Sequence, residues 1–221
     1  KAPWFPKTDG YVLPLGTISS IMAGKQAKIP YLCGCNSYET GNMEGFLSDD
    51  KARITAFANM CFPADVDGYL KTVDAYDAPS VIKAVFEQYN SDKLCALLGW
   101  QELELLRGND CFYQYYFTKD QPGPDGHGAC HGAELPYVFG TMEADRRSYN
   151  GSDFDLSVRM RAYWTNFIKT GDPNGEELPR WEKYGENNRK VMELGEHGGM
   201  IPAPLNEHRR FIVDYMLRQA N

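Results

Sequence analysis

Residues 28–36 read KIPYLCGCN, and this compact apolar run after Pro30 predicts a buried β-strand. Polar and apolar residues do not alternate within it, which is typical of a strand covered on both faces of a parallel sheet. Two further strands are predicted at 111–118, where CFYQYYFT is rich in aromatic residues, and at 189–194, which reads RKVMEL. These three segments form the framework of the expected fold.

Helical patterns separate the predicted strands. We expect helices at 18–24, 49–60, 64–75, 80–89, 92–107, 153–170 and 205–219. The helix at 153–170 carries its apolar residues on a single stripe, from Leu156 to Phe167 through Trp164, and we interpret that stripe as core. Strands interleaved with helices indicate the α/β class. Three strands are too few for this many helices, so we expect part of the sheet to be missing.

The composition describes a globular chain of 221 residues, of which 43% are hydrophobic and 13% aromatic. Its net charge of −7 argues against a nucleic-acid partner, because phosphate binding needs clustered Lys and Arg. No apolar run is long enough to cross a membrane. The first ten residues, KAPWFPKTDG, contain no signal-peptide apolar region and do not look like a natural start.

The six cysteines lie at 33, 35, 61, 95, 111 and 130, without the spacing of paired metal ligands. Cys33 and Cys35 alternate on the first predicted strand, so they share one face and cannot bridge easily. We interpret the six as buried thiols, which favours a reducing, cytoplasmic compartment. Secretion is the alternative location, and one or two disulfide bonds are an alternative interpretation of the cysteines.

Residues 130–140 read CHGAELPYVFG and place His131 on a Gly-rich loop. A loop histidine meets solvent and exchanges protons near neutral pH. The apolar segment Leu135 to Phe139 follows directly and should seat the loop against a core. We therefore interpret His131 as the candidate general base.

At this segment the chain resembles the type-B carboxylesterase/cholinesterase family, whose histidine lies in an H-G-x-E-L-P-Y-V-F-G pattern. Other family segments occur in the same order, as TDGYVLP at 8–14, IPYLCGCNSYETG at 29–41, CFYQYYF at 111–117, YWTNFIKTGDPNG at 163–175 and LPRWEKYGENNRKVMELG at 178–195. The resemblance implies an α/β-hydrolase fold and hydrolysis of carboxylic esters without a cofactor. It also implies a triad in the chain order Ser, acid, His.

The chain contains no G-x-S-x-G segment, so the nucleophile of that family is absent. Residues 1–221 would then be the C-terminal portion of one α/β-hydrolase catalytic domain, and its partners would be the N-terminal part, on the same or a separate chain, and a small-molecule ester. Self-association through the unpaired sheet is a further expectation. Two rivals stay open: a non-catalytic binding or adhesion member of the family, and an isolated domain without activity.

Carried over to this chain, the resemblance makes His131 the base and Glu39 the acid, 92 residues apart. Glu39 follows the first predicted strand, in a turn that reads YETG where the family's common form contains D-E-G. Glu44, Asp49 and Asp50 are nearby competitors for the role of the acid.

Other side chains near His131 need an interpretation. His127 precedes it on the loop and is predicted to be solvated. His127, Cys130 and His131 together are a weak metal hypothesis, because no second ligand cluster supports it. Cys130 is expected to be buried and inert rather than a reactive thiol. Glu134 is expected to be structural, accepting backbone hydrogen bonds within the loop. His197 and His208 have no sequence context that suggests a function.

Overall fold

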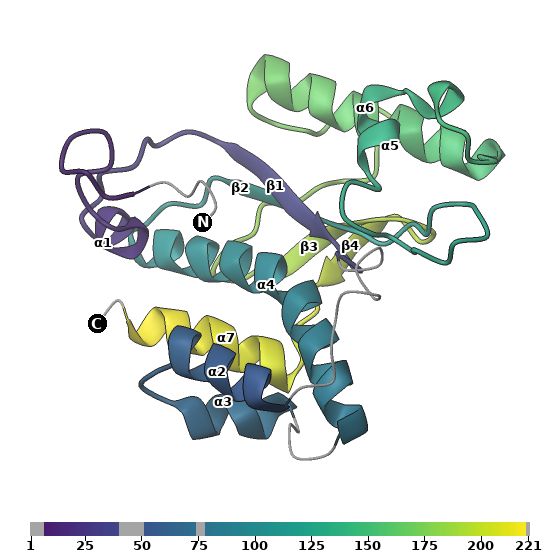
Figure 1. The fold of residues 1–221 in the computed structure, drawn as a ribbon. Helices are drawn as coiled ribbons and strands as arrows, with labels where there is room; N and C mark the ends of the chain where they lie inside the picture. Colours follow the sequence, from purple (N-terminus) through teal and green to yellow (C-terminus); the bar gives the residue numbers. More distant parts are fainter. Residues whose placement is uncertain (1–6, 40–50, 74–77, 220–221) are drawn as a thin grey trace.

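A computed structural model describes residues 7–39, 51–73 and 78–219 of the chain (Figure 1). The strands are β1 (Tyr31–Asn36), β2 (Phe112–Phe117), β3 (Lys190–Leu194) and β4 (Gly199–Pro202). The helices are α1 (Thr17–Met22), α2 (Lys51–Cys61), α3 (Val66–Val73), α4 (Ala78–Leu106), α5 (Leu135–Phe139), α6 (Gly151–Thr170) and α7 (Glu207–Arg218), with a 3₁₀ turn, η2, at Met142–Ala144. None of the helices in these ranges combines the length and apolar character needed to span a bilayer.

The described strands form one sheet in the order β1-β2-β3-β4. β1 runs parallel to β2, with Tyr31 opposite Phe112 and Asn36 opposite Phe117, and β2 runs parallel to β3. β4 closes the sheet as an antiparallel neighbour of β3. The α/β class and the three predicted strands are confirmed, and β1 lies at an edge of the sheet that these residues build.

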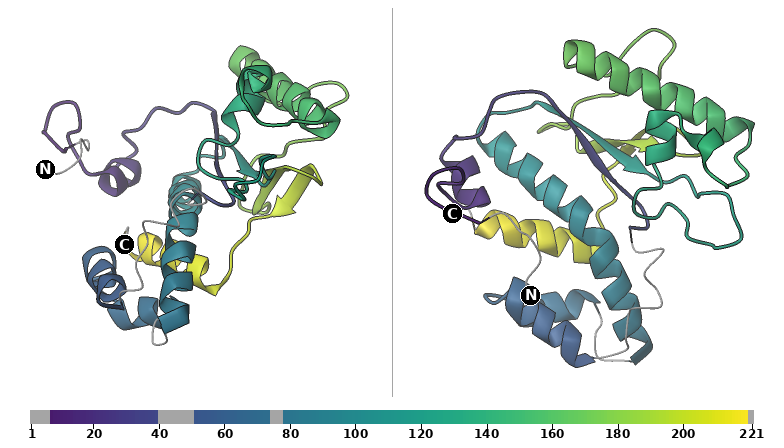
Figure 2. Two further views of the ribbon diagram at one scale, coloured as in Figure 1. Left: turned by 45° about the vertical axis from the view of Figure 1, so that its right-hand side comes forward. Right: turned by 45° about the horizontal axis from the view of Figure 1, so that its top comes forward.

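Helices cover both faces of the sheet (Figures 1 and 2). On one face α4 contacts β1, α7 packs on α4, and α2 and α3 lie further out; α5 and α6 cover the other face. Each face has its own cluster of buried apolar side chains. Cys33 and Cys35 both belong to the cluster under α4, so their predicted common face is confirmed, and Leu156 and Trp164 of the α6 stripe belong to the other cluster.

The two helices predicted at 80–89 and 92–107 are a single helix, α4, which bends along its length in Figure 1. The residues between them, Asn90 and Ser91, are weak helix formers. Neither of these two residues is proline or glycine, so nothing forces the helix to end there. Packing also supports continuity, because the buried Ser91 Oγ accepts a hydrogen bond of 3.0 Å from Arg209 Nε of α7.

Strand β4 was not predicted. Its four residues begin at a glycine and end at a proline, and both residue types indicate a turn rather than a strand. The strand forms because residues 195–198 turn the chain back along β3, where Val191 pairs with Ile201 and Met192 with Met200.

Gly34 in β1 is required by a close approach to β2. A Cβ atom at this position would overlap the Tyr115 ring, which faces Gly34 across the pair of strands. The ring therefore packs directly over the β1 backbone, in space that a side chain would otherwise take.

Candidate functional site

The two predicted site residues lie at the same end of the sheet. Glu39 is in the turn that follows β1, and His131 is in the loop that follows β2. Parallel neighbours bring their carboxyl ends to one edge, which is where open α/β sheets bind ligands. A backbone hydrogen bond of 3.1 Å from Tyr38 N to Ala129 O joins the turn to the loop.

Glu39 and His131 are in direct contact, with 2.9 Å between Glu39 Oε2 and His131 Nδ1. The other carboxylate oxygen of Glu39 accepts a hydrogen bond of 3.0 Å from the backbone N–H of Asn36. The Glu39 side chain is only 6% exposed, whereas that of His131 is 68% exposed. The result is a buried carboxylate that holds an imidazole at the surface.

Lys93 on α4 is a third charged member of this site. Its Nζ lies 2.8 Å from Glu39 Oε2 and 2.7 Å from His131 Nδ1. Burial acts to raise the pKa of Glu39, but hydrogen bonds from Lys93, the Asn36 backbone and His131 outweigh it, so the pKa of this carboxyl is lower than usual. Sequence reasoning missed Lys93, because a lysine on a predicted helix is ordinarily a solvated residue.

Asn36, the last residue of β1, links the acid turn to the histidine loop. Its buried side-chain amide donates to Cys130 O at 2.7 Å and to Glu134 Oε2 at 2.5 Å. Glu134 is thus a structural acceptor, as expected, but its donor shown here is a side chain of β1 rather than the loop backbone. Asn36 lies within the family-like segment IPYLCGCNSYETG at 29–41, which was its sequence signal.

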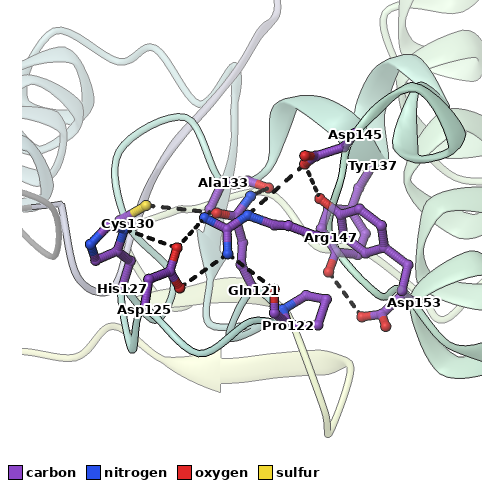
Figure 3. Close-up of polar contacts among 11 residues, drawn as sticks. Gln121, Pro122, Asp125, His127, Cys130, Ala133, Tyr137, Asp145, Arg147 and Asp153 are labelled. Atoms are coloured by element: carbon purple, nitrogen blue, oxygen red, sulfur yellow. Dashed lines mark hydrogen bonds and ion pairs between the residues drawn. The ribbon is translucent and has the colours of Figure 1, made fainter.

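An arginine stabilises the turn-rich segment 119–130 that leads to His131 (Figure 3). Arg147 binds the Asp125 carboxylate with both terminal nitrogens, at 3.1 and 2.7 Å, and donates to Pro122 O at 3.0 Å. The pKa of Asp125 falls to about 2, chiefly through this pairing. His127 also faces Asp125, with 3.4 Å between Nδ1 and Oδ2.

The segment after His131 is anchored to α6 through Tyr137. This buried tyrosine donates from its hydroxyl to Asp153 Oδ1 at 2.9 Å, and its carbonyl accepts from Ser157 Oγ at 2.8 Å. Asp153 also caps α6 by accepting from the Asn150 backbone N–H. Tyr137 and, in part, Val138 seat the loop against the core as predicted, whereas Leu135 and Phe139 of the same segment are exposed.

The remaining histidines lie apart from the acid. His127 is partly exposed beside Asp125, and His197 is exposed between β3 and β4. His208 is buried, with Nδ1 3.0 Å from Thr72 Oγ1. Within the three described ranges no cluster of His, Cys, Asp or Glu is able to hold a metal ion.

Two further expectations concern residues near the pair. All six cysteines are free thiols, and burial raises the pKa of Cys130, which argues for an inert thiol. The competing acids Glu44, Asp49 and Asp50 lie outside the described residues.

A cavity of about 790 Å³, lined by Pro30, Trp181 and Lys190 among others, lies at the amino ends of the parallel strands. It touches neither Glu39 nor His131. We assign the candidate site to the acid–histidine pair, because active sites of open α/β sheets lie beyond the carboxyl ends of the strands. An acid followed in the chain by a histidine at this end is the arrangement of α/β-hydrolases.

Comparison with known proteins gives the family. The model of the carboxylesterase family matches residues 1–212, so the chain belongs to the carboxylesterase family and its sheet is part of an α/β-hydrolase fold. Carboxylesterase 4A of Bos taurus is 29% identical over 218 residues, covering 87% of this chain and 39% of the relative. Acetylcholinesterase 1 of Caenorhabditis briggsae is 27% identical, covering 87% and 37%. Fumonisin B1 esterase of Sphingopyxis macrogoltabida is 25% identical, covering 89% and 38%. The chain spans about two-fifths of the length of these relatives.

Proposed function

We propose that Glu39 and His131 are the acid and the base of a Ser-Glu-His triad that hydrolyses carboxylic esters. The observation that carries the proposal is the 2.9 Å contact between the buried Glu39 carboxylate and His131 Nδ1. Membership of the carboxylesterase family and the chain order of acid and histidine support the same assignment.

The chemistry follows from the roles of the two groups. A neutral imidazole with its proton on Nδ1 bonds to the carboxylate and leaves the lone pair of Nε2 free. His131 Nε2 takes the proton of a serine hydroxyl as the serine oxygen attacks the ester carbonyl, and then returns it to the departing alcohol. Water repeats the sequence on the acyl-serine and releases the acid. Glu39 stays ionised near neutral pH, because its pKa is lowered, and stabilises the transient imidazolium.

The nucleophile is proposed to come from an N-terminal part of the same enzyme, on the same or a separate chain. The 221 residues contain no G-x-S-x-G segment, and they span about two-fifths of the carboxylesterase relative. In the described sheet β1 has a neighbour on one side only. Exposed apolar side chains of α5 and α6, including Phe139 and Val158, offer a further contact surface.

Substrates are proposed to be small carboxylic esters of apolar acids or alcohols. The rival hypothesis, a binding or adhesion member without catalysis, gives no physical reason for an ionised carboxylate buried against a loop histidine. Activity separates the two hypotheses.

The decisive experiment measures hydrolysis of p-nitrophenyl acetate by two forms of the protein. The 221-residue chain alone should lack enzyme-like activity, and a protein that also carries the N-terminal part should be active. In that longer form His131→Ala should lower kcat/KM by roughly four to six orders of magnitude. His197→Ala, a matched change at an exposed histidine outside the site, should leave it unaltered. Equal activity of the His131 variant and its parent would refute the assignment.

Association of the chain with itself or with the N-terminal part is tested separately, by sedimentation velocity. An unpaired parallel edge recruits other chains, so at tens of micromolar the chain alone should self-associate in sedimentation velocity, or form a stoichiometric complex with a separately produced N-terminal part. A soluble monomer that also fails to bind that part would contradict the proposed partner.

A further inference from the structure

The backbone of a tight turn decides where the His131 ring lies. The His131 side chain is 68% exposed, so packing constrains the ring little, and its contact with Glu39 depends on the turn that carries it. That turn runs from Cys130 to Ala133 and is closed by a hydrogen bond of 2.9 Å from Ala133 N to Cys130 O. Gly132, at its third position, has a φ of 81°, which suits the glycine of a type II turn.

The side-chain amide of Gln121 contacts both ends of this turn (Figure 3). Its Nε2 donates to Ala133 O at 3.3 Å, and its Oε1 accepts from Cys130 Sγ at 3.8 Å. The backbone N–H of Gln121 donates to Gly128 O at 3.3 Å, so residues 121–128 form a closed loop just before the turn. Both side-chain contacts are longer than an ordinary N–H···O bond, so they steer the turn only if Gln121 itself stays in place.

Arg147 supplies a firm attachment directly after Gln121. Its Nη1 donates to Pro122 O at 3.0 Å, and its two terminal nitrogens bind the Asp125 carboxylate at 3.1 and 2.7 Å (Figure 3). A bidentate pair of this kind fixes direction as well as distance. Arg147 lies 25 residues after Pro122, so these contacts, which we call the Arg147 clasp, close the intervening segment into a ring that contains the histidine turn.

The arginine end of the clasp is attached to the core. Arg147 Nε lies 4.0 Å from Asp145 Oδ2, which accepts a hydrogen bond of 2.8 Å from the Tyr149 hydroxyl. The Tyr149 ring packs edge-on against the ring of Tyr137, with the centroids 5.8 Å apart. Tyr137 is buried and donates to Asp153 of α6. The Arg147 guanidinium is therefore a fixed point from which the loop is held.

We propose that Arg147 is a positioning residue that keeps His131 against Glu39 by clasping the loop before the histidine turn. The consequence for catalysis rests on the proposed function, in which His131 has to meet a serine hydroxyl while it stays on the acid. A misplacement of about 1 Å costs a reaction up to about a hundredfold in rate. Because the clasp acts on the base and not on bound ester, its loss should appear in kcat rather than in KM.

The catalytic consequence is tested by the kinetics of p-nitrophenyl acetate hydrolysis in the longer form, which carries the N-terminal part. Arg147→Met should lower kcat by about 10- to 100-fold and change KM by less than about threefold. Arg147→Lys keeps the charge but not the planar fork, so its kcat should lie between those of the parent and Arg147→Met. Asp125→Asn is milder and should lower kcat less, and the double variant should lose no more than Arg147→Met alone.

Arg189→Met is the matched control, because Arg189 makes the same kind of contacts elsewhere. It binds Glu102 through two nitrogens, at 2.6 and 2.8 Å, and donates to the backbone carbonyl of Gly185. It directly precedes β3, at the end of the sheet opposite the acid–histidine pair. Arg189→Met should lower the unfolding temperature and leave kcat unchanged where the protein is folded. An equal fall of kcat in both variants would show a general loss of stability and refute the positioning role.

Hydrogen exchange of the Ala133 amide in the 221-residue chain tests the positioning without hydrolysis. This buried N–H closes the histidine turn, so its exchange reports opening of the turn. Arg147→Met should raise the exchange rate by about tenfold or more, and Arg189→Met should leave it near the parent value. An unchanged exchange rate or an unchanged kcat in Arg147→Met would each overturn the proposal. Inactivity of the longer parent would refute the esterase proposal instead, and the exchange rates would still decide whether the clasp holds the turn.

Discussion

Replacement of Asn36 should separate the acid turn from the histidine loop. Its amide nitrogen is the donor in two long-range hydrogen bonds, to the backbone carbonyl of Cys130 and to the carboxylate of Glu134. The side chain is about 1% exposed, so water cannot replace the lost donor without entering the core. Two substitutions, Asn36→Ala and Asn36→Asp, distinguish a donor role from a packing role.

The expected loss follows from the contacts. A bond to a neutral carbonyl contributes about 1 kcal/mol, and one to a carboxylate about 1.5–3 kcal/mol. Asn36 Oδ1 is buried without a partner among the described residues. Removing this unsatisfied acceptor removes its desolvation penalty and should stabilise the folded chain by about 1 kcal/mol. The net loss for Asn36→Ala is then about 2 kcal/mol in the free energy of unfolding. Asn36→Asp keeps the side-chain volume but replaces the donor by an acceptor that faces two other acceptors, Cys130 O and Glu134 Oε2. It should lower the free energy of unfolding by more than about 3 kcal/mol.

Urea unfolding of the chain at pH about 7 and about 5 measures both effects. A carboxyl beside Glu134 has a raised pKa in the folded state, so the Asn36→Asp variant should recover stability as the pH falls and lose it as the pH rises. Asn59→Ala, which removes an exposed hydrogen bond within α2, is the control and should change stability by less than about 0.5 kcal/mol. If Asn36→Asp proved no more harmful than Asn36→Ala at neutral pH, the donor argument would be wrong.

Other changes give independent readings of the structure. Gly34→Ala should destabilise the chain by about 1–3 kcal/mol in thermal unfolding, because the new Cβ collides with Tyr115; an unchanged midpoint would show that the ring is free to move. Arg147→Met should raise the pKa of Asp125 from about 2 toward its ordinary value, as followed by carboxyl NMR against pH, and no rise would contradict the pairing as its cause. The lowered pKa of Glu39 contributes stability that is present above the ordinary carboxyl pKa and lost as the pH falls through the folded-state value. Glu39→Gln should therefore reduce the loss of unfolding free energy between neutral and acidic pH, as measured by urea unfolding at several pH values. An unchanged pH dependence would argue against a paired carboxylate.

The parallel part of the sheet was predictable because its strands are continuous apolar runs, such as 28–36 and 111–118, which only a sheet covered on both faces buries well. β4 was not predictable, since a four-residue strand between turn residues has no periodic pattern to recognise. The break expected inside α4 failed for a related reason. Ser91 is a weak helix former by itself, but its contact with α7 is made by a segment more than a hundred residues away.

The site also contains residues that the sequence predicts and one that it does not. Once β1 and β2 pair in parallel, the residues that follow them meet at one edge, so the proximity of Glu39 and His131 is a consequence of topology that two local motifs are enough to anticipate. Lys93 reaches the same carboxylate from α4, and its arrival depends on the rotation of that helix about its own axis, since a turn of one residue would direct the side chain about 100° away. No pattern within 92–107 fixes that rotation relative to β1; packing against the sheet does. Lys93 is therefore a charged member of the site that only the three-dimensional structure identifies.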